Sequence, residues 1–438
     1  CGAVVQTHRY LQGEISMTYT MRTSLLFLCM AALIVGEGML VSWNSALFIL
    51  NFGLISAILA LGVNLQWGFA GLFNVGVVGF VALGGLAVVL TSTVPVAEAW
   101  SAGGARMILA LVTGAATIVA AVLAYRRLSG RTRGGVVAVI LVGGFFIYRA
   151  IFDPASQAIE AVNPAATGYL GGLGLPVLLA WPIGGLLAAG AAWLVGKAAL
   201  GLRSDYLAIA TLGIAEIIIA VMKNEDWLAR GVKNVNGLPR PVPREIDLQQ
   251  SESFISSAQS LGIDPVTAST LYVKLGYSLL FTAVLILILV AAQLALHSPW
   301  GRMMRAVRDN EVAAEAMGKD VTRRHLQIFV LGSAVCGIAG AMMTTLDGQL
   351  TPGSYQPLRY TFLIWVMVIV GGSGNNLGAV LGGFLIFFLY TKVEVWGPDL
   401  MQLVTSGMAD DNALKVHLIG SAAHMRLLTM GVILLLVL

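Results

Sequence analysis

The sequence predicts an all-α protein, a polytopic transmembrane helix bundle of about 10 to 12 spans that leaves room for broken or re-entrant helices. Of its 438 residues, 58% are hydrophobic and only 11% are charged, and the mean hydropathy is +0.85. A water-soluble domain cannot cover so much apolar surface with polar side chains. The 51 glycines agree with this class, because small residues let helices approach closely inside a bilayer.

Apolar segments of spanning length follow one another along almost the whole chain. Residues 1–20 are polar and aperiodic, so we assign them to an N-terminal extension and residues 21–438 to a single transmembrane domain. The short segment 361–372 is a candidate for a broken or re-entrant pair with 377–395. The last run, Leu427–Leu438, has 12 residues, fewer than the ~20 that span a bilayer, so we expect its helix to continue further. The predicted spans lie roughly at 25–43, 45–63, 71–91, 107–125, 135–152, 177–196, 205–222, 273–296, 327–346, 361–372, 377–395 and from 425 onward.

Basic residues are concentrated in three connections between predicted spans. Lys and Arg collect in cytoplasmic loops, and the number of spans between the groups puts all three on one side, which we assign to the cytoplasm. The polar stretch 223–272 then becomes a periplasmic loop, in which Asn236-Gly237 and several prolines predict irregular backbone. The three groups are Arg126, Arg127, Arg131 and Arg133; Lys197 and Arg203; and Arg302, Arg305, Arg308, Arg323 and Arg324.

The most informative polar segment is 301–324, GRMMRAVRDNEVAAEAMGKDVTRR, which is too polar to span and lies on the predicted cytoplasmic side. Spacings of three and four give a mostly apolar stripe that predicts a short helix, and Gly318 is suited to end it in a left-handed cap. The pattern leaves two interpretations open, a helix that docks on a partner protein and an interfacial helix on anionic lipid. The stripe consists of Met303, Val307, Asn310, Ala314 and Met317.

Glu216 is a candidate for a translocation path because it is a carboxylate inside a predicted span. Burying it unpaired would cost on the order of 3 kcal/mol. We therefore expect it to face a cavity or a partner, with a protonated helix-packing residue as the alternative.

Other candidates for the path are polar or glycine positions that interrupt apolar stretches. Asn64, Gln66 and Asn74 either line a polar passage or cap and join a broken helix, and we favour the second role. At Gly371 and Gly374, backbone groups are suited to face a water-filled cavity, and a plain turn between two helices is an equally good explanation.

The motifs of several enzyme classes are absent from the sequence. A phosphate-binding loop needs G-x-x-x-x-G-K-[ST], but Gly196-Lys197 is followed by Ala198 at the end of a predicted span. The histidines and cysteines show no metal-ligand spacing, and H-E-x-x-H does not occur. We therefore expect no catalytic residue, no metal site and no bound cofactor in this chain, with any ATP used by a partner subunit. The modest net charge of +4 gives no reason to expect nucleic acid as a partner.

Four separated stretches carry a family resemblance. They are ALGVNLQWGFAGLFNVGVVGFVALGG (60–85); GLRSDYLAIATLGIAEIIIAVMKN (201–224) with VNGLP (235–239); GRMMRAVRDNEVAAEAMG (301–318); and GGSGNNLGAVLGG (371–383). In this order they resemble the permease subunits of the high-affinity branched-chain amino acid importers, which belong to the ATP-binding-cassette (ABC) class. The urea and short-amide permeases of the same family look similar. The resemblance covers most of residues 45–395.

The resemblance implies a coupling helix in the cytoplasmic loop. In the ABC class, a Glu-Ala-Ala and later Gly pattern forms a helix that sits in a groove of the ATPase subunit. Here Val312 separates the Glu from the two alanines, so the match to the general class motif is loose, whereas the match to this subfamily is closer. The residues that we expect to couple to the ATPase are Arg305, Arg308, Glu311, Ala313, Ala314, Glu315 and Gly318.

The resemblance also implies the function and the partners. It predicts a permease subunit that moves branched-chain or related amino acids by alternating access across the bacterial cytoplasmic (inner) membrane. Its implied partners are ABC ATPase subunits, a second homologous permease subunit and a periplasmic solute-binding protein. The alternatives are a urea or short-amide permease of the same class, and a self-sufficient secondary transporter with Glu216 as an ion site.

The chain departs from the family pattern in two places. Residues 128–168 hold an extra hydrophobic insertion that many relatives lack. The stretch GVKNVNGLPRPV (231–242) is less rich in glycine than the family form.

Overall fold

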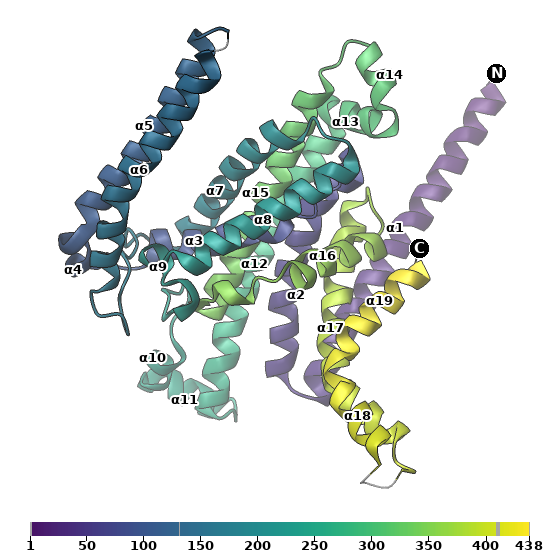
Figure 1. The fold of residues 1–438 in the computed structure, drawn as a ribbon. Helices are drawn as coiled ribbons and strands as arrows, with labels where there is room; N and C mark the ends of the chain where they lie inside the picture. The colour runs from purple at the N-terminus through teal and green to yellow at the C-terminus, as the bar shows by residue number, and fades with distance from the viewer. Residues whose placement is uncertain (1, 131, 409–411, 438) are drawn as a thin grey trace.

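The protein is almost entirely helical in this computed structural model, and the described part contains one two-stranded ladder (Figure 1). Arg131, one of the arginines assigned to the cytoplasm, lies outside the described residues. The structure describes residues 2–130, 132–408 and 412–437, without the side chains of 2–20, 358, 359 and 423.

The elements follow one another as long helices joined by short helical turns. The longer helices are α1 (Gly2–Leu40), α2 (Trp43–Val63), α3 (Val77–Ser92), α5 (Ala105–Arg127), α6 (Thr132–Glu160), α7 (Val177–Ala199), α8 (Ser204–Asn224), α12 (Pro265–His297), α15 (Val321–Asp347), α16 (Pro357–Gly371), α17 (Asn376–Val404) and α19 (Met425–Val437). The shorter helices are α4 (Ala97–Ala99), α9 (Asp226–Ala229), α10 (Glu245–Gln249), α11 (Glu252–Ser260), α13 (Pro299–Asp309), α14 (Glu311–Ala316) and α18 (Ala413–Ser421). The remaining elements are the π-helices η1 (Asn64–Gly68) and η2 (Trp100–Gly104), the 3-10 helices η3 (Gly231–Lys233), η4 (Pro352–Ser354) and η5 (Ala422–His424), and the strands β1 (Val235–Asn236) and β2 (Gln349–Leu350).

The predicted apolar segments all correspond to helices. Within the described residues, nine helices are long and apolar enough to cross a membrane, and α18 with α19, bent by 71°, gives a tenth. The segments predicted at 71–91 and 361–372 form the shorter apolar helices α3 and α16, which fall below the ~20 residues of a full span. The all-α, polytopic class is therefore confirmed.

Side-chain caps determine where several helices begin. Asp264 accepts a hydrogen bond from the Thr267 amide (3.1 Å) at the start of α12, where Pro265 occupies the first turn. Asp320 caps α15 in the same way through the amide of Arg323 (2.9 Å). These local signals place the helix starts on the polar residues that precede each apolar run.

Helices α2, α3, α7, α15 and α17 form a closely packed unit, here called the inner bundle. Glycines make the close contacts, because a Cβ at Gly84 would collide with the carbonyl of Gly337, and one at Gly340 with the carbonyl of Val81. Gly383 on α17 meets the backbone of α2 equally closely. Backbone-to-backbone contact of this kind is typical of helices that associate in lipid through small residues.

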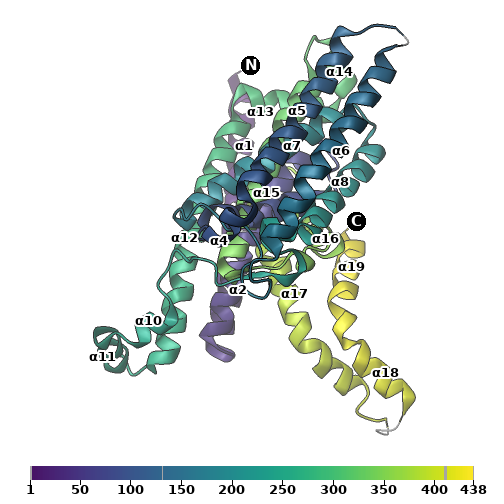
Figure 2. The same ribbon diagram turned by 60° about the vertical axis from the view of Figure 1, so that its left-hand side comes forward.

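Helices α5 and α6 form a second unit, here called the outer hairpin. Figure 1 shows it beside the rest of the bundle, and in the turned view of Figure 2 it lies in front of the bundle. Most of its large apolar side chains are exposed, and the buried large side chains are concentrated at its base, where Phe152 and Ile159 pack with Met107 and Trp227. The predicted insertion 128–168 supplies α6 and the turn that joins it to α5.

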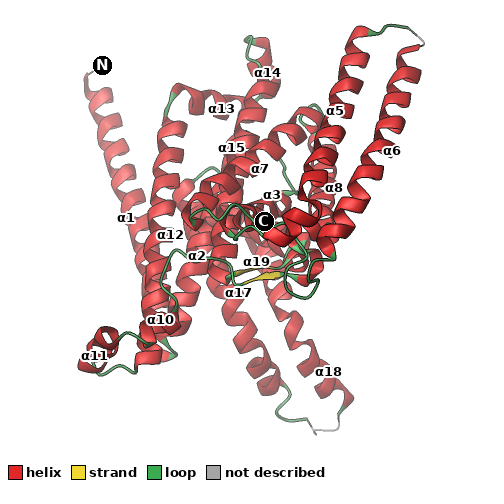
Figure 3. Cartoon of the chain, turned by 90° about the vertical axis from the view of Figure 1, so that its left-hand side faces the viewer, coloured by secondary structure: helices red, strands yellow, loops and turns green. Residues whose placement is uncertain are grey.

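The two ends of the molecule carry different connections. Figures 1 and 3 show the α5–α6 turn together with α13 and α14 at one end, and α10 and α11 at the opposite end. The α7–α8 turn lies at the first end, since Leu200 and Leu202 line a cavity with Arg308. The described residues of the three basic groups thus share one end, opposite α10 and α11 of the 223–272 loop.

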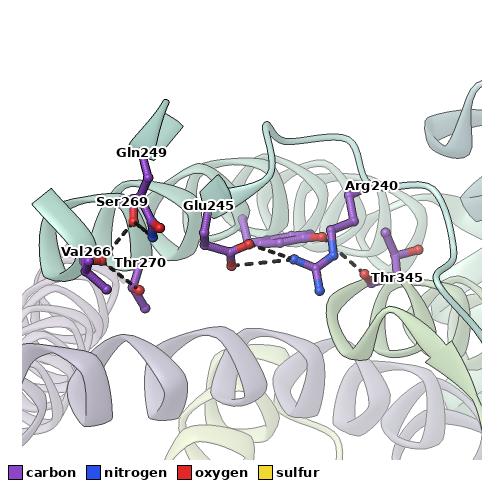
Figure 4. A network of polar contacts seen from close by, with 8 residues as sticks. Arg240, Glu245, Gln249, Val266, Ser269, Thr270 and Thr345 are labelled. Atoms are coloured by element: carbon purple, nitrogen blue, oxygen red, sulfur yellow. Dashed lines mark hydrogen bonds and ion pairs between the residues drawn. The ribbon is translucent and has the colours of Figure 1, made fainter. Parts of the chain in front are cut away.

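The 223–272 loop is tied to the end of α15. Strand β1 pairs antiparallel with β2, which directly follows α15, and Arg240 forms an ion pair with Glu245 (3.1 Å) close by (Figure 4). The Tyr277 hydroxyl donates to the Thr345 carbonyl (3.2 Å) on α15. Beside this point, burial raises the pKa of Tyr355, whose hydroxyl therefore stays neutral. The loop is a structured part of this face.

Candidate functional site

The polar segment predicted to form one short helix forms two, α13 and α14, separated at Asn310. The backbone of Asn310 is extended (φ −157°), and its side chain accepts a hydrogen bond from the Ala313 amide (2.9 Å). Asn is a favoured N-cap because its oxygen satisfies a free amide of the first turn. The N-cap therefore starts a new helix at the point where a continuous stripe was expected.

Helix α13 is anchored in the protein. Met304 and Val307 are fully buried, and the Arg305 guanidinium donates to the Leu296 carbonyl (3.4 Å). The Arg308 Nη1 donates to the Gly68 carbonyl (2.7 Å) at the end of η1. Two of the predicted ATPase-coupling residues, Arg305 and Arg308, are therefore held by contacts within this chain.

Helix α14 projects from the same end, and its residues are exposed or half-buried. Val312 is 76% exposed and Met317, directly after the helix, is 79% exposed. Gly318 ends the helix in the predicted left-handed conformation (φ +76°). Its amide donates to the Glu315 carbonyl (2.8 Å), and the Lys319 amide donates to the Ala314 carbonyl (3.2 Å). The other predicted coupling residues, Glu311, Ala313, Ala314, Glu315 and Gly318, all belong to this projecting element.

The amides Asn64, Gln66 and Asn74 lie inside the inner bundle. Gln66 donates to the Phe329 carbonyl (2.9 Å) and to Ser333 (3.0 Å) on α15, and it accepts from Asn74 (2.8 Å). All three side chains are buried. These bonds join the end of α2 to α15, and the role of the three side chains as helix caps stays a prediction.

The turn between α16 and α17 completes this region. Gly374 (φ +80°) donates its amide to Asn64 Oδ1 (2.8 Å), and the Asn64 amide donates to Asn376 (3.0 Å). Gly371 packs against Gly378, where a side chain on either would collide with the carbonyl of the other. The short helix α16 therefore folds back on α17 as an antiparallel hairpin, and four of the predicted path residues (Asn64, Gln66, Asn74 and Gly374) meet around η1.

Glu216 lies apart from this network, on α8. It is exposed and lines a cavity of about 650 Å³ whose walls are otherwise mainly apolar. Thr361 supplies a further polar group. Glu216 therefore lies at a cavity, and its place in a translocation path stays a prediction. The other lining residues are Phe73, Val75, Leu212, Pro357, Phe362, Trp365, Val366, Ile369 and Leu434.

Two features of the region escaped the sequence analysis. Trp365 is part of the cavity wall and donates its indole N–H to the Asn74 carbonyl (3.1 Å), which joins the wall to the amide network. Lys392 forms a buried ion pair with Glu37, to which Ser45 also donates (2.7 Å). Charged residues inside apolar runs are a signal that the sequence offers, because such residues need a partner in a membrane.

Comparison with known proteins identifies the family. Residues 128–438 match the family described as the permease component of a branched-chain amino acid transport system, and the chain belongs to this family. The projecting α13–α14 element and the cavity beside Glu216 both lie within or against the matched residues.

The chain aligns with only part of each individual relative. The chain is 30% identical over 234 residues (52% of this chain, 53% of the relative) to the high-affinity branched-chain amino acid transport system permease protein LivM of Escherichia coli (strain K12). It is 27% identical over 255 residues (58% and 64%) to a probable LivM of Methanocaldococcus jannaschii. It is 26% identical over 107 residues (24% and 30%) to the fructose import permease protein FrcC of Rhizobium meliloti. The chain spans about half the length of the first of these relatives, and no solved structure matches it significantly.

Proposed function

We propose that this chain is the permease subunit of an ATP-driven importer of branched-chain or related amino acids in the bacterial cytoplasmic membrane. The observation that carries the proposal is α14, a six-residue helix that projects from the end bearing the basic turns. It exposes Val312 and Met317 beside Glu311 and Glu315. An exposed apolar pair with a polar rim is the composition of a protein-binding surface.

The charge of α14 favours a protein partner over a lipid surface. Its sequence, EVAAEA, contains two glutamates and no basic residue. A helix that rests on anionic lipid needs Lys or Arg on its polar face. We therefore assign α14 to the ATPase subunit, with Glu311, Ala313, Ala314, Glu315 and Gly318 as its contact residues.

The cavity beside Glu216 forms part of the proposed solute path. A carboxylate is suited to bind an ammonium group, and the aromatic and aliphatic wall is suited to an apolar side chain. An amino acid with a branched aliphatic side chain has both groups. The open side of the cavity leaves room for the second permease subunit, which would complete the path.

The direction of transport follows from the two ends. The 223–272 loop, which is structured and tied to α15, faces outward and receives solute from a periplasmic binding protein. ATP binding in the ATPase pair shifts the permease between outward-open and inward-open states, because ATP binds those states with different affinity. Hydrolysis takes place in the partner chain.

Copurification tests this proposal directly. The tagged chain is isolated from its native membrane in mild detergent, and the ATPase activity that accompanies it is measured. The double variant Val312→Asp, Met317→Asp should reduce recovery of the ATPase at least about tenfold, because two apolar contacts are replaced by charges. The matched control is Leu261→Asp, since Leu261 is 75% exposed in the loop at the other end.

The outcomes separate the candidate functions. ATPase recovery with the wild type and with Leu261→Asp, but not with the α14 variant, supports the importer. A folded wild-type chain that brings no ATPase would contradict it and favour the secondary transporter.

A further inference from the structure

Arg308 occupies an unusual position at the joint between the anchored helix α13 and the projecting helix α14. Its Nη1 donates to the carbonyl of Gly68, which is 240 positions away in the sequence (2.7 Å). Its Nε and Nη2 are held by Asp309 Oδ1 (3.0 and 2.8 Å). The guanidinium is therefore oriented between Asp309 and the end of η1, although its side chain is 37% exposed.

The α16–α17 turn meets the same point. A Cβ at Gly374 would lie 3.2 Å from Arg308 Nη1 and 3.1 Å from the Gly68 carbonyl oxygen. The Gly374 amide is bound to Asn64, which belongs to the same π-turn as Gly68. Arg308, Gly68, Asn64 and Gly374 thus form one contact region, here called the Arg308 junction.

The two sides of the junction differ in freedom of movement. On one side, Met304 and Val307 are buried and fix α13 to the bundle. On the other side, Asn310 breaks the helix, and α14 is exposed. A cavity of about 250 Å³, lined by Arg308, Glu311 and His325 among others, borders the joint and gives α14 space to move.

We infer that Arg308 is the positioning residue that relays movement of α14 to the broken end of α2 and to the α16–α17 turn. This inference rests on the proposed function and adds the internal route of coupling. A charge-assisted hydrogen bond to a backbone carbonyl suits this role, because it is short, directional and stronger than a neutral one. Since the bound carbonyl is at a π-turn, a shift of Arg308 acts on a part of α2 that regular helix bonds do not fix. Asp309 keeps the guanidinium aligned.

The test compares Arg308→Gln with Arg302→Gln. Arg302 lies on the same helix, is exposed, and donates to the His297 carbonyl (3.2 Å) at the α12–α13 corner, so its loss is a matched removal of one charge. Hydrogen–deuterium exchange in the purified complex is measured in residues 64–76 and 372–376. We expect exchange there to accelerate about tenfold in Arg308→Gln and to stay unchanged in Arg302→Gln.

The second readout is solute transported per ATP hydrolysed in proteoliposomes. In the assembly that copurifies, Arg308→Gln should lower transport per ATP hydrolysed about tenfold, and Arg308→Lys should recover part of it. Unchanged exchange in the two segments overturns the inference, because the junction is then not held by Arg308. Faster exchange with normal transport per ATP also overturns it, because the contact is then only structural.

The failure of the inference is distinguishable from failure of the proposed function. If Arg308→Gln loses the ATPase itself, Arg308 belongs to the docking surface, and the relay is wrong while the importer stands. If the wild-type chain recovers no ATPase, the importer fails and the relay fails with it, whatever the exchange measurement gives.

Discussion

The inner bundle and the outer hairpin are both apolar and helical, but they are built on opposite principles. In the inner bundle, glycines bring backbones into contact, and buried amides such as Asn64 and Gln66 connect one helix to another. In the outer hairpin, α5 and α6 pack mainly on each other, and their hydroxyls bond within their own helix, as Thr113 does to Leu109 (2.8 Å). The difference indicates that contacts between helices hold the inner bundle together, whereas the hairpin leaves most of its apolar surface exposed.

The largest expected effect comes from the ion pair that joins Lys392 on α17 of the inner bundle to Glu37 on the neighbouring helix α1. Lys392→Met leaves the Glu37 carboxylate buried without its cation, which should lower the free energy of unfolding by about 3–5 kcal/mol. The matched change in the hairpin is Arg149→Met, because Arg149 forms an exposed i,i+4 pair with Asp153 (3.0 Å) and should cost at most about 1 kcal/mol. Both values are measured by denaturation in detergent. Equal losses in the two variants would remove the distinction between the units.

A double variant tests whether the loss of stability in Lys392→Met comes from the unpaired charge of Glu37. Adding Glu37→Leu to Lys392→Met should recover most of the stability, since the unpaired charge is then gone. No recovery would mean that Lys392 stabilises the fold through its apolar stem and not through the pair.

A smaller effect is expected at the glycine contacts. Gly340→Ala should cost about 1–3 kcal/mol, because the new methyl group would collide with the Val81 carbonyl. Gly143→Ala in the hairpin is the control, since apart from the nearby backbone of its own helix no described atom lies within 4 Å of its Cβ position. Thermal unfolding of the two purified variants checks the prediction. A larger loss at Gly143 would show that the hairpin is packed against something in the membrane.

The amide network should respond to a similar degree. Asn64→Leu removes the partner of the Gly374 amide and of Asn376, and each unsatisfied buried group costs about 1–3 kcal/mol. Thr113→Val in the hairpin should change the stability by less than about 0.5 kcal/mol. The comparison fails if the two variants unfold at the same denaturant concentration.

The smallest effect belongs to the exposed face of the hairpin. Phe146 is 67% exposed, so Phe146→Ala should change the free energy of unfolding by no more than about 0.5 kcal/mol. Copurification of the ATPase with this variant should equal that of the wild type. Loss of a copurifying protein would instead identify the hairpin as an interface.

Much of the fold was predictable because hydropathy reports on span length. Each apolar segment became a helix, and even the short α3 and α16 were found. The break at Asn310 was missed, although Asn before an Ala-rich turn is a recognisable N-cap. Contacts between residues far apart in the sequence could not be predicted. Nothing near Arg308 in the sequence indicates that it binds Gly68, and nothing near Lys392 indicates that it pairs with Glu37.

The candidate site, too, could be predicted from the sequence only in part. The sequence singled out Glu216 as a carboxylate expected to face a cavity or a partner, because charge inside a span is costly, and the structure places it at a cavity. It could not tell which polar residues line that cavity and which are buried in the bundle. The sequence shows only that Asn64, Gln66 and Asn74 are polar, which suits a polar passage as well as a contact between helices. Their hydrogen bonds, which join η1 to α15 and α17, are visible only in the structure.

The central claim is that an ATPase partner drives this chain, and reconstitution tests it most directly. Proteoliposomes are prepared with the chain alone and with the copurified assembly, and uptake of a labelled branched-chain amino acid is measured with and without ATP on the side of α14. We expect uptake only with the assembly and ATP, and loss of uptake in the Val312→Asp, Met317→Asp variant. Accumulation by the chain alone under an ion gradient would contradict it.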